Sequence, residues 1–154
     1  MGEAMWARAQ DVKIASGETS LAAWFVVPDG PGPHPCVVMG QGFSMTRHDG
    51  FAPYAEAFVA AGVAVLAFDY RYFGDSGGER RQYFSIRAQR ADWRAAVAFA
   101  TADERIDASK VVAWGFSFGG GFGCETALSD PGLAGVIALC PFVDGLQRVL
   151  GTPP

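Results

Sequence analysis

The stretch Gly115–Gly120 reads GFSFGG and follows the apolar run of residues 111–114. A serine with glycines two positions before and after it, between a strand and a helix, is typical of a sharp turn that exposes an oxygen nucleophile. The sequence therefore predicts Ser117 as a candidate for covalent chemistry. Such a serine needs a histidine to accept its proton, and the chain has only His34 and His48, both upstream of it.

The composition favours one domain with strands buried on both faces. Half of the 154 residues are hydrophobic and 18% are charged, which is more apolar than an average domain. We therefore expect residues 1–154 to form a single domain. The three cysteines, Cys36, Cys124 and Cys140, lie in apolar segments without C-x-x-C spacing, and we expect them to be reduced and buried.

The charge pattern argues against two classes of partner. The net charge is −4 and no run of lysine or arginine occurs, so the sequence gives no footprint for nucleic acid and no cationic patch for a membrane. The first residues do not resemble a signal peptide, and no apolar window of about 18 residues is present. We therefore expect a cytoplasmic protein.

Apolar runs and helical periodicities alternate along the chain, with a hairpin predicted near the start. This alternation predicts a mostly parallel sheet with helices on both faces, an α/β fold. Asp49 is the expected cap of the first helix. Strands are predicted over 11–15, 21–27, 36–39, 63–69, 110–114 and 135–140, and helices over 49–61, 85–101 and 118–128.

Three segments in the expected order resemble the α/β-hydrolase family. They are the GQGF loop at 40–43, the glycine-bearing segment 68–78 after the next strand, and the turn at 115–120. The resemblance covers about residues 11–144 and is greatest to the dienelactone-hydrolase and peptidase-like branch. It implies an α/β-hydrolase fold, and a serine hydrolase that acts on an ester, lactone or amide of a small acyl compound.

The resemblance also implies roles for particular residues. Ser117 is then the nucleophile, and the backbone amides of Phe118 and Phe43 form the oxyanion hole. Gly42, Phe43 and Tyr72 are the expected substrate-binding residues. A serine nucleophile needs no metal or organic cofactor, and we expect none.

Segment 68–78 contains further polar residues, for some of which two roles are possible. The resemblance implies that Asp69 organises the loop after its strand. Arg71, Tyr72 and Asp75 either rim a substrate pocket or fix that loop.

The sequence departs from the family in two places. Gln41 stands where many members have a histidine, which we expect to affect the rigidity of the loop. The family fold continues through two more strands whose loops carry the acid and the histidine, and the chain ends before them. We therefore expect a C-terminally truncated domain, inactive alone, whose strand at 136–139 forms an open edge. That edge would pair with a second copy or with a C-terminal partner chain.

Two residues are candidate substitutes for the absent partners of Ser117. His48 follows the 40–43 loop and is either the base or a solvated residue near a helix start. Asp144 follows the last predicted strand and is either the acid or a turn or capping residue. His34 lies between two prolines and is expected at the surface.

Three functional hypotheses remain open at this point. The chain belongs to a serine hydrolase that forms an acyl-enzyme on Ser117, or it is a non-catalytic relic that binds small acyl compounds. As a third possibility, it is an interaction module whose open edge captures a strand.

Overall fold

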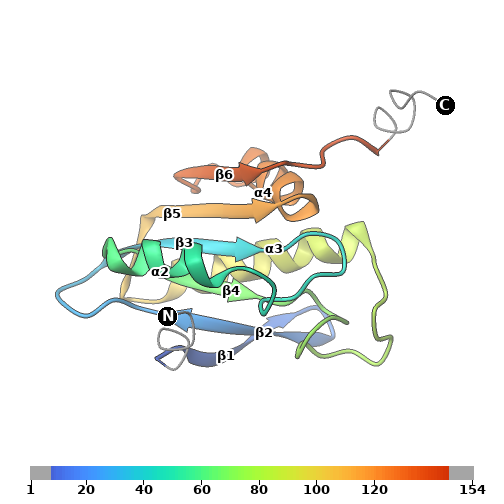
Figure 1. The fold of residues 1–154 in the computed structure, drawn as a ribbon, viewed down its shortest axis with the longest axis horizontal. Helices are drawn as coiled ribbons and strands as arrows, with labels where there is room; N and C mark the ends of the chain where they lie inside the picture. The colour runs from blue at the N-terminus through green and yellow to red at the C-terminus, as the bar shows by residue number, and fades with distance from the viewer. Residues whose placement is uncertain (1–7, 146–154) are drawn as a thin grey trace.

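A computed structural model of the chain describes residues 8–145, which form a six-stranded sheet with three helices (Figure 1). The strand order across the sheet is β1-β2-β4-β3-β5-β6. The strands are β1 (Gln10–Ser16), β2 (Thr19–Val26), β3 (His34–Gly40), β4 (Ala64–Phe68), β5 (Ile106–Phe116) and β6 (Gly135–Leu139). The helices are α2 (Ala52–Ala60), α3 (Ile86–Ala102) and α4 (Phe118–Ser129).

The sheet is mostly parallel, as the sequence predicts. β1 and β2 form the expected antiparallel hairpin, and β2 pairs antiparallel with β4. The pairs β3–β4, β3–β5 and β5–β6 are parallel. All five residues of β4 are buried, because β4 lies inside the sheet between β2 and β3 and packs into hydrophobic clusters on both of its faces.

Two hydrophobic clusters cover the two faces of the sheet. On one face, Phe51 and Ala55 at the start of α2 pack against β3, β4 and Trp114 of β5. On the other face, Trp93 of α3 and Phe122 of α4 pack against the same central strands. Figure 1 shows α2 on the opposite side of the sheet from α3 and α4. Together with the mostly parallel sheet, these layers confirm the predicted α/β fold with helices on both faces of the sheet.

The structure corrects some limits of the predicted elements. α2 begins at Ala52, with Phe51 as its cap residue and no side-chain capping bond. The carboxylate of Asp49 instead accepts bonds from the amide and hydroxyl of Thr46, at 2.7 and 2.9 Å. β5 begins at Ile106, four residues earlier than predicted, because Ile106 is buried and pairs with His34.

The β6 strand forms one edge of the sheet within residues 8–145. Its only neighbour there is β5, and Ile137 at its centre is 38% exposed. An edge strand presents unpaired backbone groups to other chains. No helix in the described part of the chain is long and apolar enough to cross a membrane.

Candidate active site

Ser117 occupies a strained turn between β5 and α4. Its backbone has φ 53° and ψ −117°, a region that residues with a side chain rarely adopt and that often marks functional positions. The turn requires glycine at 115, because a Cβ there would lie 2.2 Å from the carbonyl of Gly119. A Cβ on Gly119 would in turn lie 2.2 Å from the carbonyl oxygen of Gly40. The glycines thus allow α4 to begin directly against the end of β3.

Backbone hydrogen bonds fix the turn on its other side. The amide of Ser117 donates to the carbonyl of Leu139 at 2.9 Å, and the amide of Phe142 donates to the carbonyl of Ser117 at 2.9 Å. The end of β6 and the segment after it therefore hold the turn in place. The side chain of Ser117 is half-buried.

The two amides predicted for the oxyanion hole lie on either side of this turn. Phe118 is the first residue of α4, so its amide has no acceptor within the helix and lies at the positive end of the helix dipole. The loop that carries Phe43 reaches the serine directly, because a Cβ on Gly42 would lie 3.2 Å from the Cβ of Ser117. The rings of Phe43 and Phe118 are in contact, with centroids 5.8 Å apart.

Gln41, at the position where many family members have a histidine, anchors the 40–43 loop. Its side-chain amide donates to the carbonyl of Asp49, and its side-chain oxygen accepts from the amide of Gly42 at 3.3 Å. The hydroxyl of Tyr70, which accepts from the indole of Trp93, donates to the Gln41 carbonyl at 3.1 Å. Both the side chain and the backbone of Gln41 thus anchor the loop.

An aromatic cluster lies beside Ser117, and sequence analysis predicted only part of it. Phe84 packs against Phe43 and Phe118, with ring centroids 4.8 and 5.3 Å apart. Phe142 stacks on Phe118 with centroids 4.3 Å apart. Phe43 is 55% exposed, so the cluster presents an apolar surface to solvent. Phe84 and Phe142 belong to no motif, and no signal in a single sequence distinguishes them.

A cavity of about 180 Å³ lies next to the turn, on the face of the sheet that α2 covers. Two polar residues, Gln41 and Asp49, contribute to its wall. The remaining lining residues are Met45, Gly50, Tyr54, Trp114, Phe116 and Leu139.

The structure does not bring His48 to Ser117. The ring of His48 packs edge-on against Trp24 at 4.5 Å, and its Nε2 lies 3.4 Å from the Asp75 carboxylate. Trp24 of β2 pairs with a residue of β4, which pairs with a residue of β3, which in turn pairs with Trp114 of β5. Trp24 and Trp114 therefore lie in the same row across the sheet. Three strand spacings of about 4.8 Å place these positions about 14 Å apart. His48 is therefore not positioned to accept the proton of Ser117.

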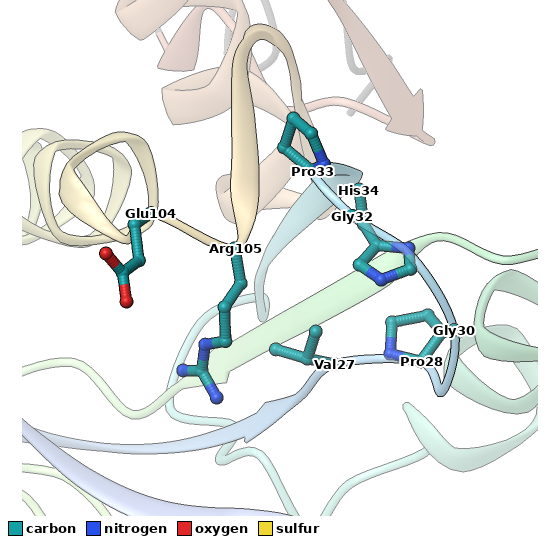
Figure 2. A pocket seen from close by; sticks show the side chains of 8 residues that line it. All are labelled: Val27, Pro28, Gly30, Gly32, Pro33, His34, Glu104 and Arg105. Carbon is teal, nitrogen blue, oxygen red and sulfur yellow. The ribbon is translucent and has the colours of Figure 1, made fainter.

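His34 lies at the opposite end of the sheet from Ser117. It begins β3, and six residue steps of about 3.3 Å separate it by about 20 Å from Gly40, the end of β3 next to the turn. The sequence placed it in a surface loop, but the residue is half-buried and pairs with Ile106. It lines a pocket of about 450 Å³ together with Val27, Pro28, Glu104 and Arg105 (Figure 2).

Asp144 and Tyr72 differ in their relation to the turn. Asp144 is exposed and lies two residues beyond Phe142, whose amide is bonded to Ser117, so its segment borders the turn. Tyr72 packs instead against Gly78 and Tyr83 and lines a pocket with residues of the β1–β2 turn. The structure therefore places Tyr72 in the loop after β4, at a pocket that the β1–β2 turn also lines.

Asp69 and Arg47 form a buried ion pair that shapes the loops after β3 and β4. Asp69 accepts from the amide and guanidinium of Arg47 at 2.6 and 2.8 Å, and from the amide of Asp75 at 3.0 Å. Burial raises the pKa of the Asp69 carboxyl, and the two backbone hydrogen bonds oppose this effect. Arg71 makes a similar pair with buried Asp92. In the structure, these residues fix the loop.

The cysteines are less buried than the sequence predicts. Cys36 in β3 is buried, but Cys124 is half-buried and Cys140 is exposed. Cys140 follows the end of edge strand β6. Among residues 8–145 no group of three or more histidine, cysteine, aspartate or glutamate side chains has the arrangement of a metal site.

Residues 32–154 match the family described as serine aminopeptidase, S33. The chain belongs to this family of α/β hydrolases. The match covers the 40–43 loop, the 68–78 segment and the turn at Ser117, the three segments on which the resemblance was first based.

Curated relatives of this S33-family chain include hydrolases. The quorum-quenching protein AidA of Acinetobacter baumannii is 44% identical over 144 residues, which cover 94% of this chain and 47% of the relative. Thiohydrolase aneE of Aspergillus aculeatus is 32% identical over 114 residues, 74% of this chain and 36% of the relative. The chain spans about half the length of the first of these relatives.

Solved structures agree with the fold of the S33-family chain. The α/β hydrolase GrgF from Penicillium sp. sh18 superposes with a TM-score of 0.83 at 25% identity, over 93% of this chain and 51% of that one. The dienelactone hydrolase of Anabaena variabilis superposes with a TM-score of 0.70 at 22% identity, over 84% of this chain and 62% of that one. This second likeness concerns the fold alone.

Proposed function

We propose that this chain supplies the nucleophile and the oxyanion hole of a serine hydrolase that forms an acyl-enzyme on Ser117. The observation that carries the proposal is the backbone of Ser117, held at φ 53° at the start of α4. Folded proteins retain such strain where the surrounding structure enforces it, commonly at active sites. The glycines around the turn provide that enforcement.

The proposed reaction has two steps. The Oγ of Ser117 attacks the substrate carbonyl carbon, its proton passes to a base, and the carbonyl oxygen accepts hydrogen bonds from the amides of Phe43 and Phe118. The bond to the leaving group then breaks, the leaving group takes the proton, and water later cleaves the acyl-enzyme. Loss of one such oxyanion donor costs about 100- to 1000-fold in turnover.

We propose that the base and its acid partner come from a segment outside the 154 residues. His48 packs against Trp24, and His34 lies at the far end of β3. The matched relatives are about twice as long as this chain, and the resemblance implies that later loops carry the acid and the histidine. Asp144, in the segment bonded to the Ser117 turn, is the acidic candidate that the sequence indicates in this chain.

The proposed substrates are esters, lactones or amides of small acyl compounds. The exposed ring of Phe43 and the half-buried rings around Phe118 favour apolar groups next to the scissile carbonyl. Relatives named as thiohydrolases support a thioester as a further substrate, because a thioester undergoes the same attack at its carbonyl carbon.

The experiment uses two forms of the protein. One is the 154-residue chain, and the other is this chain fused to the segment of the Acinetobacter relative that follows the matched region. Hydrolysis of p-nitrophenyl esters and labelling by a fluorophosphonate are measured for both. We expect the fusion to turn over the ester and the chain alone to be slower by orders of magnitude, because it lacks the base.

Matched variants of the fusion identify the residues responsible. Ser117→Ala should abolish turnover, whereas His48→Ala should leave it unchanged. Circular dichroism confirms that each variant is folded. A folded Ser117→Ala fusion that retains full turnover would contradict the proposal, and loss of turnover in His48→Ala would show that the base lies in this chain.

A further inference from the structure

The cavity of about 180 Å³ has a defined position relative to Ser117. Two residues of its wall adjoin the serine. Phe116 directly precedes Ser117 in the chain, and the carbonyl of Leu139 accepts a hydrogen bond from the amide of Ser117. Gln41 in the wall directly precedes Gly42, which contacts the Cβ of Ser117. The cavity therefore borders both the 40–43 loop and the nucleophile turn.

The lining of the cavity determines the chemistry of its ligand. Most of its wall is apolar, and none of its lining residues is a lysine, arginine or histidine. The side-chain amide of Gln41 is used in a bond to the Asp49 carbonyl, and the Asp49 carboxylate accepts from Thr46. Because the wall is mostly apolar and an anion has no cation to pair with there, the cavity favours an apolar group over an anion.

The rings of Trp114 and Tyr54 limit the size of that group. Trp114 is buried between Phe51 and Tyr54, with ring centroids 5.5 and 5.0 Å away. Tyr54 is 46% exposed and lines the cavity on the side of α2. A volume of about 180 Å³ holds about six methylene-sized groups, if each takes the roughly 30 Å³ of a water molecule.

We propose that this cavity binds a short, straight alkyl group of the substrate, next to the carbonyl that Ser117 attacks. That the bound group belongs to a substrate rests on the proposed function. Binding of an alkyl group in the cavity does not require that Ser117 reacts. The aromatic cluster around Phe118 then faces the rest of the substrate on the other side of the turn.

The test measures the binding of primary alcohols from ethanol to octanol to the 154-residue chain by tryptophan fluorescence. Trp114 lines the cavity, so the Trp114→Phe variant shows which part of the signal arises there. We expect the affinity to rise about fourfold for each added carbon, because each carbon buries one more methylene group. The rise should stop at about six carbons, when the cavity is full. An unbroken rise through octanol, or no change in fluorescence from Trp114, would overturn the proposal.

Variants of the wall provide a second measurement. Met45→Phe should fill part of the cavity, so that the affinity stops rising at a shorter alcohol. Tyr54→Ala should enlarge the cavity, so that the affinity stops rising at a longer alcohol. Leu128→Ala removes an apolar side chain that is 90% exposed on α4 and serves as the control, with no expected change. Equal chain-length profiles in all three variants would contradict the assigned site.

The alcohols form no covalent bond with Ser117, so the same series in Ser117→Ala separates the two proposals. A length limit that persists in this variant supports the binding site even if the serine proves unreactive. Labelling of Ser117 without any length limit would support the proposed function and reject the alkyl site.

Discussion

Gly42 lies against Ser117 so closely that a Cβ on the glycine would be 3.2 Å from the Cβ of the serine. The two residues belong to loops that follow different strands, β3 and β5, which run parallel and end at the same edge of the sheet. Their contact sets the distance between the serine and the amide of Phe43. The geometry of the proposed oxyanion hole thus depends on the absence of one side chain.

Gly42→Ala should therefore impair the site more than the fold. The added methyl group meets Ser117 at 3.2 Å and Phe116 at 3.4 Å, so the loop must move by a few tenths of an ångström. Because oxyanion donors act only at short distance, we expect the rate of ester hydrolysis by the fusion protein to fall at least about tenfold. The free energy of unfolding in urea should change by less than about 1 kcal/mol. An unchanged rate would show that the 42–43 amides do not contact the oxyanion.

Gly121 and Gly123 in α4 should respond to alanine in opposite directions. A Cβ on Gly121 would lie 2.1 Å from the carbonyl oxygen of Phe142, whereas the nearest atom to a Cβ on Gly123 is 3.5 Å away. Gly121→Ala should destabilise the chain by about 1–3 kcal/mol through overpacking. Gly123→Ala should stabilise it by up to about 1 kcal/mol, because alanine has the higher helix propensity. Urea denaturation measures both, and equal effects would contradict the described contact.

Alkaline pH should destabilise the fold through Cys36. Burial raises the pKa of this thiol from 9.0 to about 12. Between these values the unfolded chain loses the thiol proton and the folded chain keeps it, so the free energy of unfolding falls as pH rises. The slope from this group is at most about 1.4 kcal/mol per pH unit. Between pH 8 and 11, the free energy of unfolding should fall less steeply with pH in Cys36→Ala than in the unchanged chain. Identical slopes for the two proteins would show that the thiol titrates normally.

The β6 edge should make the 154-residue chain associate. Ile137 is 38% exposed on a strand whose outer side has no partner among residues 8–145, and such edges pair with other strands. Sedimentation velocity should show a molecular mass that rises with protein concentration. Ile137→Lys should reduce this association, because charge on an edge strand opposes pairing, whereas Leu128→Ala should not. A monomer at all concentrations would contradict the prediction.

The sequence predicts the sheet and helices well because their signals are local. β4 consists of five consecutive buried apolar residues, and the periodicity of α3 marks its buried face. The limits are less predictable, since Asp49 has the chemistry of a helix cap but bonds to Thr46 instead. The choice between those two partners depends on the path of the whole loop.

The candidate site is only partly visible in the sequence. The glycine spacing around Ser117 has a local steric cause, and the motif therefore identifies the turn. The contacts of Phe84 and Phe142 with Phe118 join segments far apart in the chain, and no local pattern encodes them. The remote position of His48 likewise becomes clear only from the register of β2, β4, β3 and β5.

The central claim is that Ser117 accepts the acyl group. The most direct measurement is mass spectrometry of the fusion protein after a brief exposure to a p-nitrophenyl ester and acid quenching, with peptide mapping of any adduct. We predict one acyl adduct, located on the peptide that contains Ser117 and absent from Ser117→Ala. An adduct on another residue, or hydrolysis that continues unchanged in the folded Ser117→Ala protein, would contradict the claim.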